Sequence, residues 1–261
     1  MMLPYEKRLK ERNVVEKFSA ETDPSLGCAP RERSVNELVE QGIVNVNKPK
    51  GPTSHEVSEH VKDIFGVKKA GQSGTLDPAV TGVLPIGISK ATRVLGGLLS
   101  AGKEYVCLMH IHESQTKDEI ERVCEAFTGR IKQLPPIKSA VKRRWRYRMI
   151  YYLDIIEISD NGQDVLFRVG CEAGTYIRKL CDDMGKTLGC GAHMAQLLIT
   201  KVGLFDDASM VTLQELEDCW RLYEQEKSPS AEAALKEILQ PMEVAVEHLS
   251  QVWITDNAVP F

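Results

Sequence analysis

Residues 70–86 read AGQSGTLDPAVTGVLPI, and this stretch follows neither the helical nor the strand period. Three glycines and two prolines interrupt it, which is typical of a chain that leaves regular structure. The pattern predicts a long structured loop that ends before a helix-like run from Ser89. Such loops, supported by a rigid scaffold, commonly present functional side chains.

The residues before this loop predict one strand and one helix. Residues 42–47 (GIVNVN) alternate as a half-buried strand does, and the KPKGP run at 48–52 ends it. Residues 53–56 (TSHE) form a capping box, with a hydroxyl at the first position and a carboxylate three residues later. The helix that follows has an apolar face made of Val57, Val61, Ile64 and Phe65.

Further along, strands occur singly and in pairs between helices. Strands are predicted at 104–112, 149–158, 165–170 and 195–203, and helices at 116–127, 174–188, 212–226 and 229–239. Residues 1–41 show no clear periodicity, so we interpret them as an N-terminal arm. Because there is no strict alternation of strand and helix, the sequence favours an α+β fold over a doubly wound sheet.

Composition narrows the class of protein. The chain has 261 residues, of which 43% are apolar, enough for a sizeable core and too many for a wholly disordered chain. No uninterrupted apolar stretch approaches the ~20 residues that cross a bilayer, and the charged start argues against a secretory signal. The seven cysteines contain no CxxC pair, so we expect reduced thiols in a cytosol-like compartment.

Charge is distributed unevenly along the chain. Residues 206–261 hold 12 acidic and 3 basic residues, a net charge of −9, whereas residues 1–205 hold 30 bases and 25 acids, a net of +5. A nucleic-acid partner for the first part is therefore compatible with the overall net charge of −4. The acidic end is equally compatible with solvated helical faces.

Asp77 is the most unusual candidate for chemistry. It stands directly before Pro78, which forces its backbone into an extended conformation. Gly74, three residues earlier, allows the backbone to turn sharply before it reaches Asp77. A carboxylate on a stiff loop can serve as a nucleophile or base. The pattern alone favours the alternative, a turn in which Asp77 bonds its own backbone.

Arg178 is the second candidate. It lies near the start of the predicted 174–188 helix, at the edge of its apolar stripe, where a guanidinium could clamp a carboxylate or phosphate. A solvated surface arginine is the alternative.

The third candidate is a basic segment with interleaved aromatics. Residues 138–148 (KSAVKRRWRYR) contain six bases, two aromatics and no acid. The bases can neutralise phosphates, and Trp145 and Tyr147 offer faces on which unpaired bases stack. An ordinary exposed loop would have the same composition.

Other motifs are weak. His110 and His112 share one strand face, but the sequence supplies no third ligand at metal spacing. There is no phosphate-binding glycine loop, and no motif in the sequence predicts a metal, a nucleotide or a redox cofactor.

Taken together, several segments resemble the TruB-type pseudouridine synthases, and most closely their archaeal and eukaryotic guide-dependent, dyskerin-like branch. The matching segments, which run across about residues 20–257, are KPKGPTSHEV (48–57), SGTLDPAVTGVLP (73–85), AGKEYV (101–106), QLPPIKSAVKRR (133–144), EAGTYIRKL (172–180), GAHMAQL (191–197) and ILQPMEVAVEHL (238–249). The resemblance implies the pseudouridine-synthase fold, with a mixed, largely antiparallel central sheet flanked by helices.

It also implies an isomerase that detaches uracil from its ribose and rejoins it through carbon 5, without cofactor or metal. Asp77 would be the carboxylate that attacks an everted nucleoside, whether at the sugar or at the base, and Arg178 would pair with it and keep it ionised. Tyr105 would stack on the target base. The resemblance adds a substrate-binding set, Lys48, Pro49, Gln72, Tyr176 and Leu197, and an RNA-binding set, Lys138, Lys142, Arg143, Arg144, Arg146 and Arg148.

Three features depart from the family pattern. Gln72 stands where a histidine usually precedes the catalytic loop, and Leu198 and Ile199 stand where two arginines are common. Relatives also continue into a PUA domain. We therefore expect an arm at 1–41, a catalytic domain at 42–257 and a truncated start of that domain at 258–261, in a chain that is either a fragment or a reduced form.

The implied partners are a guide RNA, a substrate RNA and three proteins: a zinc-ribbon protein, a glycine/arginine-rich protein and a kink-turn-binding protein. We expect ribosomal RNA modification within an H/ACA ribonucleoprotein, away from membranes, in the cytoplasm of an archaeal-type cell or the nucleolus of a eukaryotic one. The alternatives are a guide-independent synthase for tRNA and a non-catalytic RNA-binding scaffold.

Overall fold

The computed structural model describes residues 2–17, 19, 23, 25, 27–136 and 142–254. Its helices are α1 (Pro4–Lys10), α2 (Val35–Gln41), α3 (Ser54–Phe65), α4 (Leu95–Ser100), α5 (Lys117–Ala126), α6 (Ile177–Leu188), α7 (Leu213–Glu226) and α8 (Pro229–Ile238). Its strands are β1 (Gly42–Lys48), β2 (Ala70–Gln72), β3 (Thr81–Ile88), β4 (Lys103–Ile111), β5 (Gly129–Gln133), β6 (Arg146–Ile158), β7 (Asp164–Cys171), β8 (Ala192–Val202), β9 (Phe205–Asp206) and β10 (Leu239–Pro241).

All ten strands belong to one mixed sheet. The order is β10-β1-β3-β8-β4-β7-β6-β5, with β2 added to β3 and β9 added to β8. Strands β3 and β8 run parallel, and the other pairs of named strands are antiparallel. This confirms the predicted α+β class with a mixed, largely antiparallel sheet.

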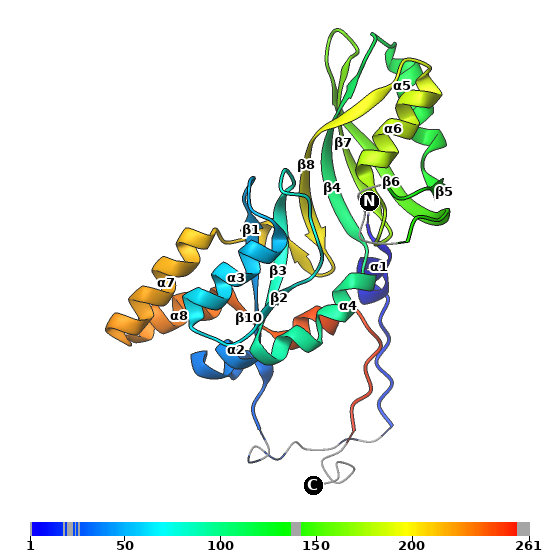
Figure 1. Ribbon diagram of the computed structural model, residues 1–261. Coiled ribbons are helices and arrows are strands. Elements are labelled where there is room, and N and C mark those ends of the chain that lie inside the picture. Colours follow the sequence, from blue (N-terminus) through cyan, green and yellow to red (C-terminus); the bar gives the residue numbers. More distant parts are fainter. Residues whose placement is uncertain are drawn as a thin grey trace.

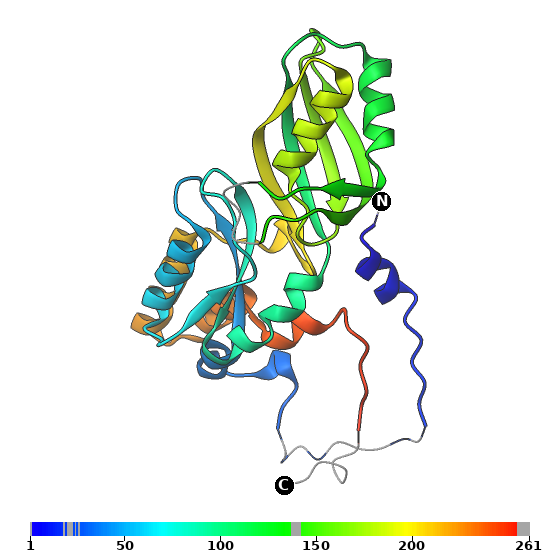
Figure 2. The same ribbon diagram turned by 45° about the vertical axis from the view of Figure 1, so that its right-hand side comes forward.

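The sheet divides into two halves, each with its own helices (Figure 1). The lower half in that view holds β1, β2, β3 and β10 with α2, α3, α7 and α8, and the upper half holds β4 to β8 with α5 and α6. A 45° turn keeps the two halves distinct (Figure 2). One apolar cluster fills the upper half and extends into the lower half through Ile43 and Val83, a second lies within the lower half, and Leu76 packs against both. The loop that carries Leu76 therefore lies at the junction.

The halves join where two backbones approach closely. Strands β3 and β8 pair over only two positions, Thr81 with Leu198 and Gly82 with Ile199. Gly82 has a φ of 101°, and a Cβ at this position would lie 2.2 Å from the Ile199 carbonyl oxygen. A residue with a side chain is therefore excluded both by the backbone conformation and by the contact.

Most predicted elements are confirmed, with shifted ends. Helix α3 begins with the predicted capping box, in which the Thr53 amide donates to Glu56 at 2.6 Å and the Glu56 amide donates to Thr53 at 3.2 Å. Strands β6 and β7 form the predicted antiparallel pair, and α7 and α8 occupy the acidic end.

The prediction of one long loop over 70–86 is wrong in part. Residues 70–72 form β2, and residues 81–86 belong to β3, including Pro85. Pro85 has no amide hydrogen to donate, and its carbonyl accepts from the Ser73 amide at 3.0 Å. The irregular part is limited to residues 73–80.

Two further differences concern β5 and β6. Strand β5 lies at the sheet edge and was not predicted, because its GRIKQ pattern is short and mainly polar. Strand β6 begins at Arg146, so the end of the basic segment is a strand and not a loop.

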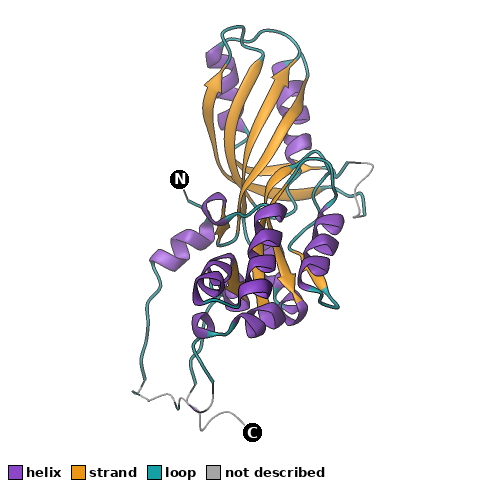
Figure 3. Ribbon diagram, turned by 90° about the vertical axis from the view of Figure 1, so that its left-hand side faces the viewer, coloured by secondary structure: helices purple, strands orange, loops and turns teal. Residues whose placement is uncertain are grey.

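The N-terminal residues contact both halves. The Tyr5 hydroxyl donates to the Gly203 carbonyl, and Glu6 accepts from Lys201 at 2.8 Å, beside the upper half. Helix α2 packs against β1, β3, β10 and α8 in the lower half. Figure 3 shows α1 beside the sheet, apart from the helices that cover the lower half. The division at residues 41 and 257 stays a prediction, and 258–261 lie outside the described residues.

No helix in the described part of the chain is long and apolar enough to cross a membrane.

Replacing Gly82 with alanine tests the junction. We expect Gly82→Ala to lower the free energy of unfolding by at least about 2 kcal/mol, because strain at positive φ and overpacking each cost about 1–3 kcal/mol. Urea denaturation measures the loss. Gly129→Ala is the matched control, since Gly129 has a φ of 99° and nothing within 4 Å of the added Cβ. Equal losses in the two variants would contradict the role of the close approach.

Candidate active site

A buried lysine holds the loop that carries Asp77. Lys48, at the end of β1, has no exposed surface. Its ammonium group donates to three carbonyls, those of Pro49 at 3.0 Å, Pro78 at 3.3 Å and Val80 at 2.8 Å. Because an ammonium has three donors, all of them are used. Lys48 therefore fixes the loop backbone directly after Asp77, at Pro78 and Val80, and ties it to the end of β1.

Burial also places a positive charge behind the loop. Desolvation lowers the pKa of Lys48, while the negative charges of Asp77 and Glu56 act in the opposite direction. The resemblance assigns Lys48 and Pro49 to substrate binding. The Lys48 ammonium is occupied by backbone carbonyls, and Pro49 is exposed with its carbonyl bound to Lys48. Contact of either residue with substrate stays a prediction.

Helix α3 supplies a second attachment for the loop. Ser54, the first residue of α3, is fully buried, and its hydroxyl accepts from the Leu76 amide at 2.9 Å. The Gly51 amide donates to the Pro78 carbonyl at 2.9 Å, and the Val80 amide closes a turn on the Asp77 carbonyl at 3.0 Å. The turn is therefore closed by backbone groups, and the Asp77 side chain can contact other groups. The alternative considered from the sequence was a turn in which the Asp77 side chain bonds its own backbone.

Arg178 and Asp77 form an ion pair across the junction. The Arg178 guanidinium donates through Nη2 to Asp77 Oδ2, although the residues are 101 positions apart. Asp77 belongs to the β2–β3 loop and Arg178 to the first turn of α6 in the other half of the sheet. Their side chains are 54% and 56% exposed, so the pair is open to a large ligand.

Gln133 sets the position of the α6 N-terminus. Its amide group accepts from the Tyr176 amide and donates to the Tyr176 carbonyl, both at 3.1 Å. Tyr176 is the N-cap of α6, two residues before Arg178. The edge strand β5 is therefore attached to the helix that carries the arginine.

Tyr105 lies in β4, in the same core cluster against which Leu76 packs. It pairs with Val169 on one side and Ile199 on the other, and only 8% of it is exposed. Burial raises the pKa of Tyr105 far above its ordinary value. The phenol is consequently neutral and can donate a hydrogen bond.

Lys103 and Ser54 are site residues that the sequence reasoning missed. Lys103 shares the strand face of Tyr105, and a Cβ added at Gly74 would lie 3.1 Å from its Nζ. Burial lowers the pKa of Lys103. The AGKEYV motif at 101–106 includes Lys103 and was a signal for it. Ser54 gave no such signal, because it follows the capping residue Thr53 and was read only as part of the capping box.

The remaining predicted substrate residues are Gln72, Leu197 and Tyr176, and their contact with substrate stays a prediction. Gln72 ends β2 and accepts from the Ser58 hydroxyl at 3.1 Å, so part of its amide is already bound to α3. Leu197 in β8 is partly buried against the upper core. Tyr176 is half-buried at the α6 N-cap.

The predicted RNA-binding bases fall into two groups. Lys142, Arg143 and Arg144 are exposed, and Arg146 and Arg148 are half-buried in β6. Arg148 donates to Glu172 at 3.4 Å and lies against Gly174, where an added Cβ would be 3.0 Å from its Nη2. Arg148 therefore reaches the segment before α6. Lys138 lies outside the described residues.

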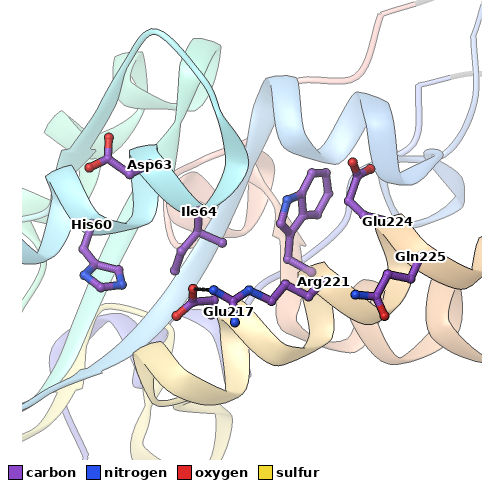
Figure 4. Close-up of a pocket in the computed structure, with 8 residues that line it drawn as sticks. His60, Asp63, Ile64, Glu217, Arg221, Glu224 and Gln225 are labelled. Carbon is purple, nitrogen blue, oxygen red and sulfur yellow. Dashed lines mark hydrogen bonds and ion pairs between the residues drawn. The ribbon is translucent and has the colours of Figure 1, made fainter.

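A groove of about 550 Å³ lies elsewhere, between α3 and α7 (Figure 4). It is lined by His60, Asp63, Ile64, Glu217, Trp220, Arg221, Glu224 and Gln225. Neither Asp77 nor Arg178 lines it. Because the side chains of Asp77 and Arg178 are about half exposed, the pair is open to a macromolecular substrate.

The histidines come together without forming a metal site. His193 of β8 lies beside His112, with His193 Nδ1 3.0 Å from His112 Nε2, and His110 Nδ1 lies 2.8 Å from Asp164 Oδ1. Within the described residues, no group of three or more histidine, cysteine, aspartate or glutamate side chains is placed to hold a metal ion.

Comparison with known proteins gives the family. Residues 62–177 match the TruB family pseudouridylate synthase N-terminal domain, residues 178–247 the tRNA pseudouridylate synthase B C-terminal domain, and residues 5–58 the DKCLD domain. The chain is 51% identical to the "Probable tRNA pseudouridine synthase B" of Methanopyrus kandleri, over 98% of this chain and 74% of that protein. The chain belongs to the TruB family. It is therefore an RNA pseudouridine synthase, an isomerase.

Other relatives extend this comparison. The Methanosarcina barkeri protein of the same name is 52% identical over 95% of this chain and 72% of its own length. Among solved structures, the fold matches a chain of a Cbf5-Nop10-Gar1 complex with a TM-score of 0.86 and 49% identity, over 92% of this chain and 71% of that one. It also matches a chain of an H/ACA RNP bound to a substrate RNA containing 2'-deoxyuridine, with a TM-score of 0.85 and 45% identity, over 94% and 73% of the two chains.

Lys48 gives a direct test of loop positioning in this TruB-family enzyme. We expect Lys48→Met to slow pseudouridine formation at least about tenfold, because three backbone carbonyls lose their donor and the Asp77 loop loosens. Single-turnover rates at saturating RNA measure the effect.

Lys50→Met is the matched control, since Lys50 is an exposed lysine two residues away. It should retain the parent rate. Equal rates for the two variants would show that the buried ammonium does not position the loop.

Proposed function

We propose that this chain is the catalytic subunit of an H/ACA-type guide ribonucleoprotein that isomerises uridines in ribosomal RNA. The observation that carries the proposal is the fold match, with TM-scores of 0.82 to 0.86 and 45–49% identity, to chains solved in Cbf5 complexes. The half-exposed Asp77–Arg178 pair supports it, since a guide-held RNA needs an open site. The partners would be guide RNA, substrate RNA and three proteins. These are a zinc-ribbon protein, a glycine/arginine-rich protein and a kink-turn-binding protein.

In the proposed mechanism, Asp77 is the catalytic carboxylate and Arg178 pairs with it and fixes its orientation. Base eversion costs a few kcal/mol. The bond from the sugar to N1 of uracil breaks, the base turns, and a bond from the sugar to C5 forms. N1 gains a proton and C5 loses one, so atoms and charge balance without a cofactor. Tyr105 would support the turned base and take part in the final proton transfer.

The basic residues would hold the RNA backbone. Lys142, Arg143 and Arg144 are exposed, with Arg143 donating to the Pro135 carbonyl at 3.3 Å, whereas Arg148 lies against Gly174 before α6. Pairing with phosphates would stabilise the complex in a salt-dependent manner. Tyr176, Leu197 and Gln72 would then line the uracil site. In an archaeal-type cell such a particle would lie in the cytoplasm, and in a eukaryotic cell in the nucleolus.

A guide-independent tRNA synthase is the second candidate. The names of the curated relatives, tRNA pseudouridine synthase B, favour it. The presence of Asp77, Tyr105 and Arg178 disfavours a non-catalytic scaffold, because a protein that only binds RNA needs none of these three residues.

Tritium release from RNA labelled at C5 of uridine separates these candidates. The proposal predicts release only when guide RNA and the partner proteins are present. Release from unguided tRNA at a comparable rate would favour the stand-alone enzyme. Absence of release in both assays would overturn catalysis by this chain.

Asp77→Asn tests the catalytic carboxylate. It keeps the size of the side chain and its ability to accept from Arg178 but removes the negative charge. We expect tritium release to fall at least about 10⁴-fold, as for other enzymes that lose a nucleophile, while RNA affinity and thermal unfolding stay near those of the parent. Substantial residual turnover would remove Asp77 from this role.

A further inference from the structure

Lys103 is a cation of the candidate site without an anionic partner. It is the first residue of β4 and is half-buried. Within the part of the chain that the structure describes, its ammonium makes no hydrogen bond and no ion pair. A Cβ added at Gly74 would lie 3.1 Å from its Nζ, so the ammonium faces the loop that carries Asp77. A charge that is partly removed from water and left unpaired is costly, and a bound anion would relieve that cost.

The groups beside Lys103 do not neutralise it. Cys171 is directly opposite in β7, and burial raises the pKa of its thiol to about 12, so the thiol stays uncharged. Glu104 is the next residue, but successive side chains of a strand point to opposite faces. Its carboxylate accepts from the hydroxyls of Tyr152 and Thr200. The charge of the Lys103 ammonium is therefore available to a bound group.

Two other cations near Asp77 are already engaged. Arg178 donates to Asp77 itself, and all three donors of the Lys48 ammonium bind backbone carbonyls. Of these three cations, Lys103 is the one that can contact the substrate without breaking an existing bond.

The reaction places negative charge on the uracil base. When the bond from the sugar to N1 breaks, its electron pair stays on the base and is shared by N1, O2 and O4. If a carboxylate instead adds to C6 of the base, the electron pair moves to C5 and O4. Both routes develop an anion on the base, and a cation that is already in place stabilises the transition state more than solvent water does.

Lys103 is placed to meet that anion. It shares its strand face with Tyr105, the predicted stacking partner of the base. Residues two apart on a strand are separated by about 6.8 Å, a distance that a lysine side chain can span. Gly74 leaves the ammonium uncovered, because a side chain at this position would contact Nζ. A uracil that rests on Tyr105 beside Asp77 would therefore have Lys103 within reach.

We propose that the Lys103 ammonium binds a carbonyl oxygen of the target uracil and stabilises the negative charge that forms on the base during isomerisation. The proposal deepens the proposed function and rests on it, because it assumes that Asp77 acts on an everted uridine. The electron pair that the base receives when the bond to N1 breaks forms the new bond from C5 to the sugar. Lys103 thus donates hydrogen bonds and neither gains nor loses a proton.

A comparison of two bases tests this role in the full chain with guide RNA and partner proteins. Lys103→Met keeps the length of the side chain and removes its charge. We expect single-turnover isomerisation of uridine at saturating RNA to slow at least about 100-fold, as when an enzyme loses one donor to a developing oxyanion. For 5-fluorouridine the loss should be at least about fivefold smaller, because fluorine stabilises the base anion without the cation. Chromatography of the digested RNA measures both conversions as loss of the starting nucleoside. Equal losses for the two bases, or no loss, would overturn the proposal.

A second variant keeps the charge and displaces it. Gly74→Ala should push the ammonium away from the loop and slow uridine isomerisation at least about fivefold, since small misplacements of a reacting group are costly. Gly71→Ala is the matched control, because its added Cβ would lie at an ordinary 3.5 Å from Thr92. It should retain the parent rate. Equal rates for these two variants would contradict a role for the position of the ammonium.

Binding of a charged base separates this proposal from the function on which it rests. The base of 6-hydroxyuridine is an anion at neutral pH, and this nucleoside can replace the target uridine in the RNA. The parent chain should bind this RNA at least about tenfold more tightly than the uridine RNA, as enzymes bind analogues of a charged transition state. Lys103→Met should lose the preference. An equal preference in the two proteins would overturn the assignment of Lys103, whereas absence of isomerisation by the parent chain would overturn the proposed function alone.

Discussion

The close approach of β3 and β8 at Gly82 is the constraint on which the site depends. Two pairs of residues connect the halves of the sheet there, and a Cβ would collide with the Ile199 carbonyl. Because the backbones are this close, a loop at the start of β3 in one half reaches a helix that packs on the other half. Asp77 and Arg178, distant in sequence, meet as a consequence.

Two buried polar side chains turn this proximity into a fixed geometry. Lys48 binds carbonyls after Asp77, and Ser54 binds the amide before it. Burying an ammonium is costly unless its donors are satisfied, so its position allows little freedom. The carboxylate is thereby presented from an irregular loop whose backbone is nevertheless held by several hydrogen bonds. Gln133 does the same for the helix of Arg178.

The sequence predicts the local features and misses the long-range ones. The capping box at Thr53, the Asp-Pro pair at Asp77 and the helical period around Arg178 are encoded by neighbouring residues, so they can be read directly. The roles of Lys48 and Ser54 depend on carbonyls and amides more than twenty residues away, which no local pattern specifies. Strand β5 was missed for a similar reason, since its pairing with β6 and not its composition makes it a strand.

The structure of this chain bound to a short RNA with an everted uridine analogue would test the central claim most directly. The account predicts that the reacting nucleoside lies within about 3.5 Å of an Asp77 carboxylate oxygen, that Arg178 stays on that carboxylate, and that the base rests on the Tyr105 ring. An everted nucleoside bound beyond the reach of Asp77, in the α3–α7 groove or elsewhere, would contradict it.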